Sequence, residues 1–516
     1  MDDGAIYDLL VVGGGINGSG IARDAAGRGL KVLLCEQGDL AEHTSSASTK
    51  LIHGGLRYLE HYEFRLVRKA LKEREVLLHA APHIIWPMRF IMPHAAHLRP
   101  RWLIRLGLFL YDHLGGRTSL PGSRAVDLEE HEAGAALLPE LTQGYAYSDC
   151  WVQDSRLVVL NALDAAERGA DVRTRTACLG AERSGGLWRA TLQDRATGCV
   201  QRIRARAIAN AAGPWVGDFL GSVAAVAAAG REAASVRLIK GSHLVVKKLF
   251  DHDHAYLLQT ADARVIFVIP YETDYTLIGT TDQAFEGDPS RVEIDEAEIT
   301  YLCATVNGFF RTRVAPEDVV WSYAGVRPLY DDDNEDASAI TRDYRLQLDG
   351  GSGEAPLLSV FGGKITTYRT LAEEALQLLE KPLGCRGLAW TATATLPGGD
   401  LPGADFERWL NSQRARYAFL PESLLRRYAR NYGTRMDVLI GSAGRLADLG
   451  RDLGGGIHVA ELEYLVRHEW ARTAADVLWR RSRMGLHVGQ ATAEAVEAWF
   501  CDDQAAASPT ASTGRV

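Results

Sequence analysis

Three glycines near the start of the chain have the spacing of a dinucleotide-binding turn. The segment Gly13-Gly14-Gly15-Ile16-Asn17-Gly18 matches G-x-G-x-x-G directly after a short hydrophobic run. In such a turn the first glycine permits a tight bend, the second lets the backbone approach a pyrophosphate, and the third allows a helix to pack closely on a strand. A carboxylate closing the next hydrophobic run can accept hydrogen bonds from ribose hydroxyls. We therefore expect a dinucleotide to bind at Gly13, Gly15, Ile16, Asn17, Gly18 and Glu36.

A segment rich in hydroxyl groups and glycine comes soon afterwards. Residues 44–58 read Thr-Ser-Ser-Ala-Ser-Thr-Lys-Leu-Ile-His-Gly-Gly-Leu-Arg-Tyr. A loop of this composition suits contact with a second phosphate and with the edge of a flavin ring. The glycine pattern alone does not separate NAD from FAD. Its position near the N-terminus, together with this segment, favours FAD.

The elements that must position these residues follow from the hydrophobic pattern. Around the glycine turn it predicts a βαβ unit with strand 6–12, helix 17–29 and strand 31–36. Further strands are predicted at 203–213 and 357–363, and β-branched segments fill 236–280. From 403 onward the pattern predicts arginine-rich amphipathic helices at 403–416, 421–430, 458–481 and 489–500, after a Pro-Gly linker.

These elements predict an α/β fold with two interleaved domains and a helical third. Residues 1–395 are expected to hold a Rossmann-like FAD-binding domain (about 1–90, 150–235 and 355–395) and a mixed β-sheet substrate domain, or cap (about 90–150 and 236–354). An α-helical C-terminal domain is expected over 396–503. The small, polar stretch 504–516 is expected to be disordered.

Composition narrows the classes of function. The 516 residues carry a net charge of −9, which argues against a surface devoted to nucleic acid. The seven cysteines are scattered, without zinc spacing or a disulfide framework, so we expect no metal and a reducing cytoplasm. No secretory signal and no run of 18 apolar residues is found in the sequence, so no membrane crossing is expected.

A basic and aromatic segment at 98–111 could still contact a membrane surface. Arg99, Arg101 and Arg105 flank an apolar run that contains Trp102 and Phe109. The segment is too short to span a bilayer, but a basic helix with aromatic residues suits shallow interfacial insertion. The alternative is a buried helix of the substrate domain.

Beyond these motifs the chain resembles a known family, the aerobic, quinone-linked glycerol-3-phosphate dehydrogenases. These enzymes belong to the larger group of FAD enzymes built on the D-amino-acid oxidase pattern. The resemblance covers nearly the whole chain, and its similar stretches include 13–20, 44–65, 99–120, 147–151, 240–243, 278–282, 325–328, 341–344, 359–369 and 463–485. Two departures are small: Ala212 lacks a hydroxyl that is more usual in the family, and Thr49 stands where serine is also common.

The resemblance implies a reaction and a set of residues for it. Non-covalent FAD would take a hydride on N5 from C2 of sn-glycerol 3-phosphate, yielding dihydroxyacetone phosphate. His53 is the candidate general base, because an ordinary imidazole accepts a proton near neutral pH. Arg57 and Arg327 would bind the phosphate or hydroxyls, with Arg342 and Lys364 as further cations and Tyr58 lining the pocket. Further FAD contacts are implied at Thr44, Ser45, Ser46, Lys50, Leu51, Ala211, Gly213, Gly363, Lys364 and Thr366.

The resemblance also implies partners and leaves alternatives open. Electrons would pass to a membrane quinone, from a homodimer attached peripherally to the inner face of the cytoplasmic membrane through the 98–111 segment. One alternative is an oxidase that passes electrons to oxygen, and another is a flavin amine or amino-acid oxidase. The second would need one arginine for a carboxylate, whereas several cations here suit phosphate better. A flavin-containing binding or RNA-modification protein without dehydrogenase activity is disfavoured, because acids interleave the C-terminal arginines.

Overall fold

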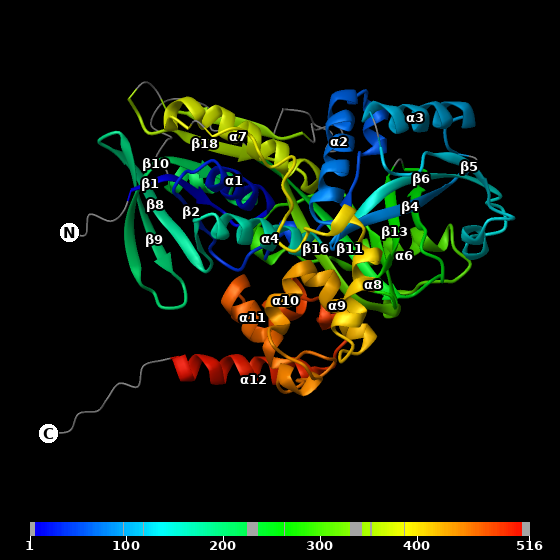
Figure 1. The fold of residues 1–516 in the computed structure, drawn as a ribbon. Coiled ribbons are helices and arrows are strands. Elements are labelled where there is room, and N and C mark those ends of the chain that lie inside the picture. The colour runs from blue at the N-terminus through cyan, green and yellow to red at the C-terminus, as the bar shows by residue number, and fades with distance from the viewer. Residues whose placement is uncertain are drawn as a thin grey trace. The chain divides into compact units, whose positions relative to one another are not determined.

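The structure, a computed structural model, describes residues 6–95, 97–116, 118–223, 236–262, 264–330, 343–350, 353–385 and 387–507. Two compact units divide the chain, Met1–Leu396 and Pro397–Val516. The first unit contains two large β-sheets, and the second is helical (Figure 1).

The first sheet is built around a central parallel strand that leads into the glycine turn. Strand β1 (Ile6–Val12) is an aliphatic run whose middle residues are fully buried, as expected of a strand covered on both faces. It lies between β10 (Val200–Asn210) and β2 (Val32–Cys35), both parallel to it. Val12 pairs with Asn210 on one side and with Cys35 on the other, so the carboxyl ends of the three strands meet at one edge.

The remaining strands extend this sheet in both directions. Its order is β17-β18-β10-β1-β2-β7, with β18 (Leu357–Phe361) and β7 (Asp171–Arg173) parallel to their inner neighbours and β17 (Arg345–Asp349) antiparallel. A hairpin of β8 (Thr176–Ser184) and β9 (Leu187–Asp194) pairs with β10. Helix α1 (Ile16–Gly27) packs between α4 (Asp154–Glu167) and α7 (Tyr368–Leu383), as Figure 1 shows.

The second sheet forms the cap and is mostly antiparallel. Its order is β15-β11-β14-β13-β12-β4-β6-β3, while β16 pairs with β11 and β5 with β6. The bounds are β3 Leu51–Ile52, β4 Ile85–Pro93, β5 Arg124–Asp127, β6 Gln143–Val152, β11 Val236–Lys247, β12 Ala255–Gln259, β13 Val265–Tyr271, β14 Tyr275–Gly279, β15 Gln283–Ala284 and β16 Val319–Tyr330. One face packs on α6 (Glu296–Asn307) in an apolar core that includes Leu244, Val268 and Leu302.

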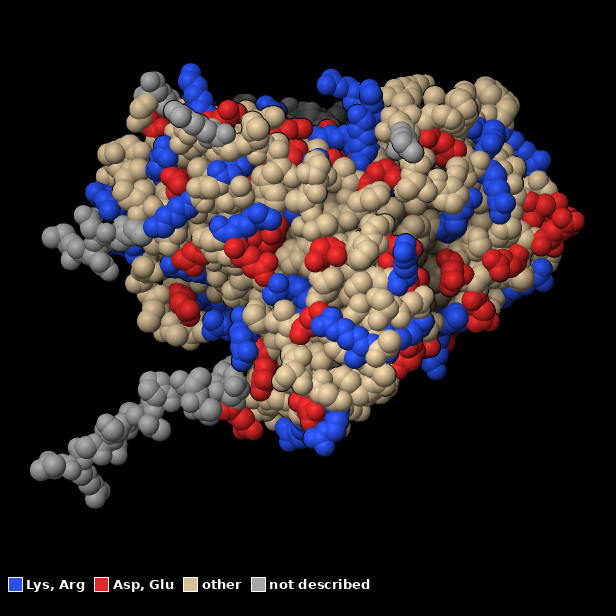
Figure 2. All heavy atoms as spheres, in the orientation of Figure 1, with Lys and Arg blue, Asp and Glu red and all other residues tan. Residues whose placement is uncertain are grey.

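Two helices follow the hydroxyl-rich segment and its sheet. Helix α2 spans Phe64–Ala80 and contacts α3, which spans Arg101–Leu114. Helix α3 buries Leu108 and Tyr111 but leaves Trp102, Leu106 and Phe109 exposed. In Figure 2 the surface over α3 is largely without charge, while basic side chains border it. Within the described residues, no helix combines the length and the hydrophobicity that a membrane span requires.

The C-terminal unit is a compact helical domain with its own core. Its helices are α8 Phe406–Arg416, α9 Glu422–Tyr432, α10 Met436–Ile440, α11 Val459–Glu469 and α12 Gln490–Ala507. The core packs Leu410, Tyr428, Tyr432 and Leu465 together. Arg427 ion-pairs with the buried Glu461 at 2.6 Å, so part of the arginine-rich character is internal to this domain.

Most predicted elements are confirmed, with differences in the bounds of two helices and in the assignment of two strands to sheets. The helix predicted over 458–481 ends at Glu469, because Trp470 adopts a left-handed conformation that stops it. Helix α12 extends to Ala507, into the stretch predicted to be disordered. The chain also crosses between the sheets more often than the predicted segments imply, since β3 belongs to the cap sheet and β17 to the cofactor sheet. The very short helix α5 (Val216–Asp218) was not anticipated.

Candidate functional site

The glycine turn between β1 and α1 brings distant backbone segments into close contact. Gly13 has a φ of +106°, and a Cβ there would lie 2.4 Å from the carbonyl oxygen of Ala211. A Cβ at Gly18 would lie 1.8 Å from the carbonyl oxygen of Gly13. Gly13 and Gly18 therefore perform the two packing roles expected of them, and the amides at the start of α1 point to the edge where a pyrophosphate would bind.

Glu36 stands at the end of β2, beside this turn. Its carboxylate accepts hydrogen bonds from the N–H of Gly14 at 2.6 Å and of Gly38 at 2.8 Å. Burial raises the pKa of Glu36, and the two backbone donors oppose that rise. The carboxylate is thus fixed in place, with its side chain lining a cavity.

Two adjoining cavities run from this turn into the cap. The first, of about 390 Å³, is lined by the glycine turn, Glu36, Ala211 and Gly213. The second, of about 260 Å³, lies between the hydroxyl-rich segment and the cap sheet. Residues common to both linings are Ile16, Thr44, Ser45, Pro328, Gly362 and Gly363. An extended dinucleotide that carries a flavin fits this arrangement, with its nucleotide end at the turn and its ring in the second cavity.

Three segments are tied together where the cavities join. Ser45 Oγ accepts a hydrogen bond from the N–H of Ile16 at 3.0 Å. Asn17 Nδ2 donates to the carbonyl of Gly362 at 3.1 Å, and Thr44 Oγ1 donates to the carbonyl of Val326 at 2.7 Å. The helix start, the hydroxyl-rich segment and the loop after β18 are therefore held as one wall.

The second cavity collects the residues proposed for chemistry. Strand β3 leads directly to His53, whose N–H donates to Thr366 Oγ1 at 3.2 Å and whose ring meets the edge of Phe267. Gly55 turns the chain with a φ of +73°, and a 3₁₀ helix from Leu56 to His61 then presents Arg57 and Tyr58. His53, Arg57, Tyr58, Arg327 and Lys364 all line the cavity.

The cations of this cavity differ in their partners. Arg327 donates to Asp282 and, at 3.0 Å, to Thr280 Oγ1. The Lys364 ammonium lies 3.7 Å from the centre of the Tyr58 ring, a cation–π contact. Among the described residues, no hydrogen bond or ion pair engages the guanidinium of Arg57. The cavity therefore carries an uncompensated positive charge that suits an anionic substrate.

Some expected residues lie elsewhere. Lys50 forms a fully buried ion pair with Asp154 at 2.9 Å, so its ammonium does not line either cavity. Ser46 donates to the carbonyl of His43, and neither Ser46 nor Gly18 belongs to the lining of either cavity. Arg342 falls outside the described residues.

Among the lining side chains that were not singled out from the sequence are Asp149, His243 and Asp282. His243 is buried, its Nε2 lies 2.9 Å from Thr49 Oγ1, and its ring stacks on Tyr323. Burial first, and then the charges of Lys50 and Arg327, hold the pKa of His243 well below its ordinary value of 6.5. The sequence feature that could have identified such residues is a polar residue inside an apolar strand, as in Tyr147-Ser-Asp149-Cys-Trp151.

Comparison with known proteins agrees with this geometry. The family described as FAD dependent oxidoreductase matches residues 8–369, and the C-terminal domain of alpha-glycerophosphate oxidase matches 390–500. A glycerol-3-phosphate dehydrogenase of Pseudomonas aeruginosa is 55% identical over 93% of this chain and 92% of its own length. A D-erythritol 1-phosphate dehydrogenase of Brucella abortus is 53% identical over 96% and 97%.

A solved structure has the same fold over almost the whole chain. It is the glycerol-3-phosphate dehydrogenase of Bacillus halodurans in complex with FAD, with a TM-score of 0.79 at 27% identity, covering 98% of this chain and 92% of that one. The matches confirm the resemblance recognised from the sequence and the D-amino-acid oxidase type of fold. The chain thus belongs to the FAD-dependent oxidoreductase family, in the branch that includes the bacterial glycerol-3-phosphate dehydrogenases, and its cofactor is FAD.

Proposed function

We propose that the protein oxidises sn-glycerol 3-phosphate to dihydroxyacetone phosphate with non-covalently held FAD and passes the electrons to a membrane quinone. The observation that carries this proposal is the cation set of the second cavity. Arg57 has no partner among the described residues, and it shares the lining with Lys364 and Arg327. A phosphate dianion is the charge that such a group of cations recognises.

Each side chain has a distinct part in the proposed reaction. Bound FAD supplies a hydride acceptor for the C2 hydrogen of the substrate. His53 accepts the proton of the C2 hydroxyl. It lines the cavity, and its backbone N–H is anchored to Thr366. Arg57 and Arg327 bind the phosphate, and Asp282 orients the Arg327 guanidinium. Lys364, whose ammonium lies over the Tyr58 ring, stabilises the negative charge of the reduced flavin. Arg342 remains a further candidate cation.

D-Erythritol 1-phosphate is a second candidate substrate. The relatives named for the two activities are 55% and 53% identical to this chain, so identity does not separate them. Both compounds are polyol phosphates, and the same cations would bind either phosphate. They differ in the length of the carbon chain, which the part of the cavity beyond the phosphate must accommodate.

Steady-state turnover with a soluble quinone separates these possibilities. We expect kcat/KM for sn-glycerol 3-phosphate to exceed that for D-erythritol 1-phosphate by at least about tenfold and that for glycerol by at least about a thousandfold. A preference for D-erythritol 1-phosphate would reassign the substrate. A kcat/KM for glycerol equal to that for sn-glycerol 3-phosphate would show that the site does not recognise the phosphate.

Helix α3 is the proposed site of attachment to a lipid surface. Trp102 is 69% exposed and Phe109 53%, and together with Leu106 they lie on one side of the helix. Arg99, Arg101 and Arg105 stand beside them, as interfacial helices require. Such attachment to the inner face of the cytoplasmic membrane would bring the protein to the layer that contains quinone. The homodimer also remains a prediction, which light scattering of the FAD-loaded protein would test.

A further inference from the structure

A buried carboxylate stands at the wall of the second cavity without a part in the proposed chemistry. Asp149 lies on β6, is 2% exposed and belongs to the cavity lining. Strand β6 pairs with β3 in the register Ile52 to Cys150, so Asp149 comes next to the residues that immediately follow β3. These are His53 and Gly54, at the start of the segment that also carries Arg57.

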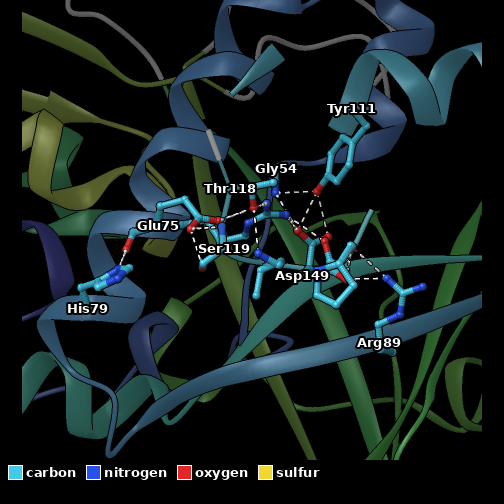
Figure 3. A network of polar contacts seen from close by, with 12 residues as sticks. Gly54, Glu75, His79, Arg89, Tyr111, Thr118, Ser119 and Asp149 are labelled. Atoms are coloured by element: carbon cyan, nitrogen blue, oxygen red, sulfur yellow. Dashed lines mark hydrogen bonds and ion pairs between the residues drawn. The ribbon is translucent and has the colours of Figure 1, made fainter. Parts of the chain in front are cut away.

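The carboxylate of Asp149 accepts hydrogen bonds from three donors, one of which is the Gly54 backbone N–H (Figure 3). The Gly54 N–H donates to Tyr111 Oη at 2.8 Å and to Asp149 Oδ1 at 3.3 Å. Tyr111 Oη in turn donates to Asp149, 2.7 Å from Oδ1 and 2.8 Å from Oδ2. Arg74 Nη1 donates to Oδ1 at 2.9 Å. The Gly54 N–H is thus hydrogen-bonded to Tyr111 and Asp149, which are themselves joined by buried hydrogen bonds.

The members of this cluster come from three different elements. Arg74 belongs to α2, Asp149 to β6, and Tyr111 to the buried side of α3. Arg74 balances the charge of Asp149 and also donates to the carbonyl of Ser148 at 2.8 Å. A buried ion pair persists when its remaining hydrogen-bonding positions are satisfied, and here Tyr111 and Gly54 satisfy those of the carboxylate.

The contact is too close to tolerate a side chain at residue 54. A Cβ on Gly54 would lie 2.7 Å from Tyr111 Oη and 2.5 Å from Leu71 Cδ2. The backbone on the other side of His53 is also fixed, because the His53 N–H donates to Thr366 Oγ1 at 3.2 Å. The amides before and after the His53 Cα therefore each have a defined partner, which holds the backbone that carries the imidazole.

We propose that Asp149 and Tyr111 are positioning residues for the reaction: through the Gly54 amide they fix the backbone from which His53 reaches the substrate. The inference rests on the proposed function, because it assigns these residues to the same cavity and the same step. Neither residue transfers a proton or touches the substrate in this scheme. Displacement of a reacting group by about 1 Å can lower a rate by about a hundredfold, so a lost backbone anchor acts mainly on the rate of reduction.

Tyr111→Phe is the decisive variant, because it removes one hydroxyl and leaves the Asp149–Arg74 ion pair intact. Asp149→Asn would leave the Arg74 charge uncompensated and can prevent folding, so it serves only as a supporting variant. The matched control is Tyr256→Phe. Tyr256 is also a buried tyrosine of the cap, donates to the carbonyl of Ala133 at 2.5 Å, and does not line the cavity.

The first readout is anaerobic stopped-flow reduction of the FAD-loaded protein by sn-glycerol 3-phosphate or D-erythritol 1-phosphate. In Tyr111→Phe we expect the limiting rate of flavin reduction to fall by at least about tenfold, with the apparent Kd of the substrate changed by less than about threefold. Tyr256→Phe should retain the wild-type rate. A wild-type limiting rate in Tyr111→Phe, or an equal loss in both variants, would overturn the proposal.

The second readout does not depend on the substrate. Amide hydrogen exchange of the peptide covering 51–58, in FAD-loaded protein without substrate, should be at least about tenfold faster in Tyr111→Phe than in wild type or Tyr256→Phe. Unchanged exchange would contradict the anchoring of Gly54. If neither phosphate reduces the wild-type flavin, the proposed function fails, while the exchange measurement still decides whether Tyr111 anchors this segment.

Discussion

At the scale of single residues, the cations of the substrate cavity are not equivalent. Arg327 is already paired with Asp282, and Lys364 stacks on Tyr58, whereas Arg57 has no partner among the described residues. An arginine that is not committed to the protein has all its donors available to a ligand. Arg57 should therefore contribute most of the phosphate affinity.

Removal of the Arg57 side chain tests this directly. Arg57→Ala should weaken the apparent affinity for sn-glycerol 3-phosphate by about a hundredfold while the FAD content stays at the wild-type level, because truncation deletes charge-assisted hydrogen bonds to the phosphate. Substrate titration of flavin reduction measures it. Arg68→Ala is the control, since Arg68 is an exposed arginine of α2 outside the cavity lining. Equal losses in the two variants would assign the effect to net charge.

His243 makes stability depend on pH in a predictable direction. Its pKa is held well below 6.5 by burial and by Lys50 and Arg327, so it stays neutral in the folded protein while it protonates in the unfolded chain. Below about pH 6.5 the unfolded state then binds more protons, and the free energy of unfolding decreases as the pH falls. The stabilisation is fully present above this range.

His243→Asn should remove this contribution. Between about pH 6.5 and 5, the free energy of unfolding of the wild type should fall more steeply than that of the variant, by up to about 1.4 kcal/mol per pH unit. Urea unfolding followed by tryptophan fluorescence at several pH values provides the slopes. Above about pH 7.5 the two slopes should coincide. Identical slopes at pH 5–6 would show that His243 titrates normally.

The sequence revealed those site residues that lie close together along the chain. His53, Arg57 and Tyr58 share one short segment with glycines, and the structure brings them to one cavity with Arg327 and Lys364. Asp149 and His243 sit inside cap strands, where a polar residue is normally a sign of a local hydrogen bond. Their importance comes from pairing between strands distant in sequence, which periodicity does not encode. The buried ion pair of Lys50 could not be foreseen either, because its partner, Asp154, lies on another element.

At the scale of elements, α3 has two sides of different character. One side buries Tyr111 against Asp149, and the other exposes Trp102, Leu106 and Phe109 to the surroundings. Exposed aromatic residues next to arginines are costly in water and favourable at a lipid interface. The amphipathic pattern read from the sequence agrees with the observed exposure, because one side of the helix is buried and the other is exposed.

Substitution of both exposed aromatic residues tests the attachment. Trp102→Ala combined with Phe109→Ala should lower binding to vesicles of phosphatidylethanolamine and phosphatidylglycerol by at least about tenfold, because it removes two side chains that insert into the interface. Co-sedimentation measures binding, and turnover with a soluble quinone should be unaffected. Leu388→Ala is the control, since Leu388 is 86% exposed and lies outside α3. Undiminished vesicle binding by the double variant would exclude this helix as the attachment site.

At the same scale, local breaks explain where element prediction failed. The pattern of 458–481 is amphipathic throughout, but Trp470 takes a φ of 57° and ends α11 at Glu469. A left-handed tryptophan is not anticipated by propensity, because glycine or asparagine usually occupies that position. The βαβ unit was predicted well, since its strand ends and glycine turn are all local features.

At the scale of the whole molecule, the two cavities are lined by residues of two sheets that the chain enters in turn. The cofactor sheet supplies the glycine turn and Glu36, and the cap sheet supplies Asp149, His243 and Arg327. The hydroxyl-rich segment and the loop after β18 join the two cavities between them. The sequence indicated interleaved domains from the order of strands, but the exact crossings at β3 and β17 depend on sheet pairing and were placed differently.

The most direct test of the central claim is anaerobic reduction of the purified, FAD-loaded protein by sn-glycerol 3-phosphate, followed by reoxidation with ubiquinone-1 or with air. The account predicts that the substrate bleaches the flavin absorbance, that ubiquinone-1 restores it within seconds, and that air restores it much more slowly. Flavin that stays oxidised with sn-glycerol 3-phosphate would contradict the substrate. Reoxidation by air as fast as by quinone would contradict the dehydrogenase and identify an oxidase.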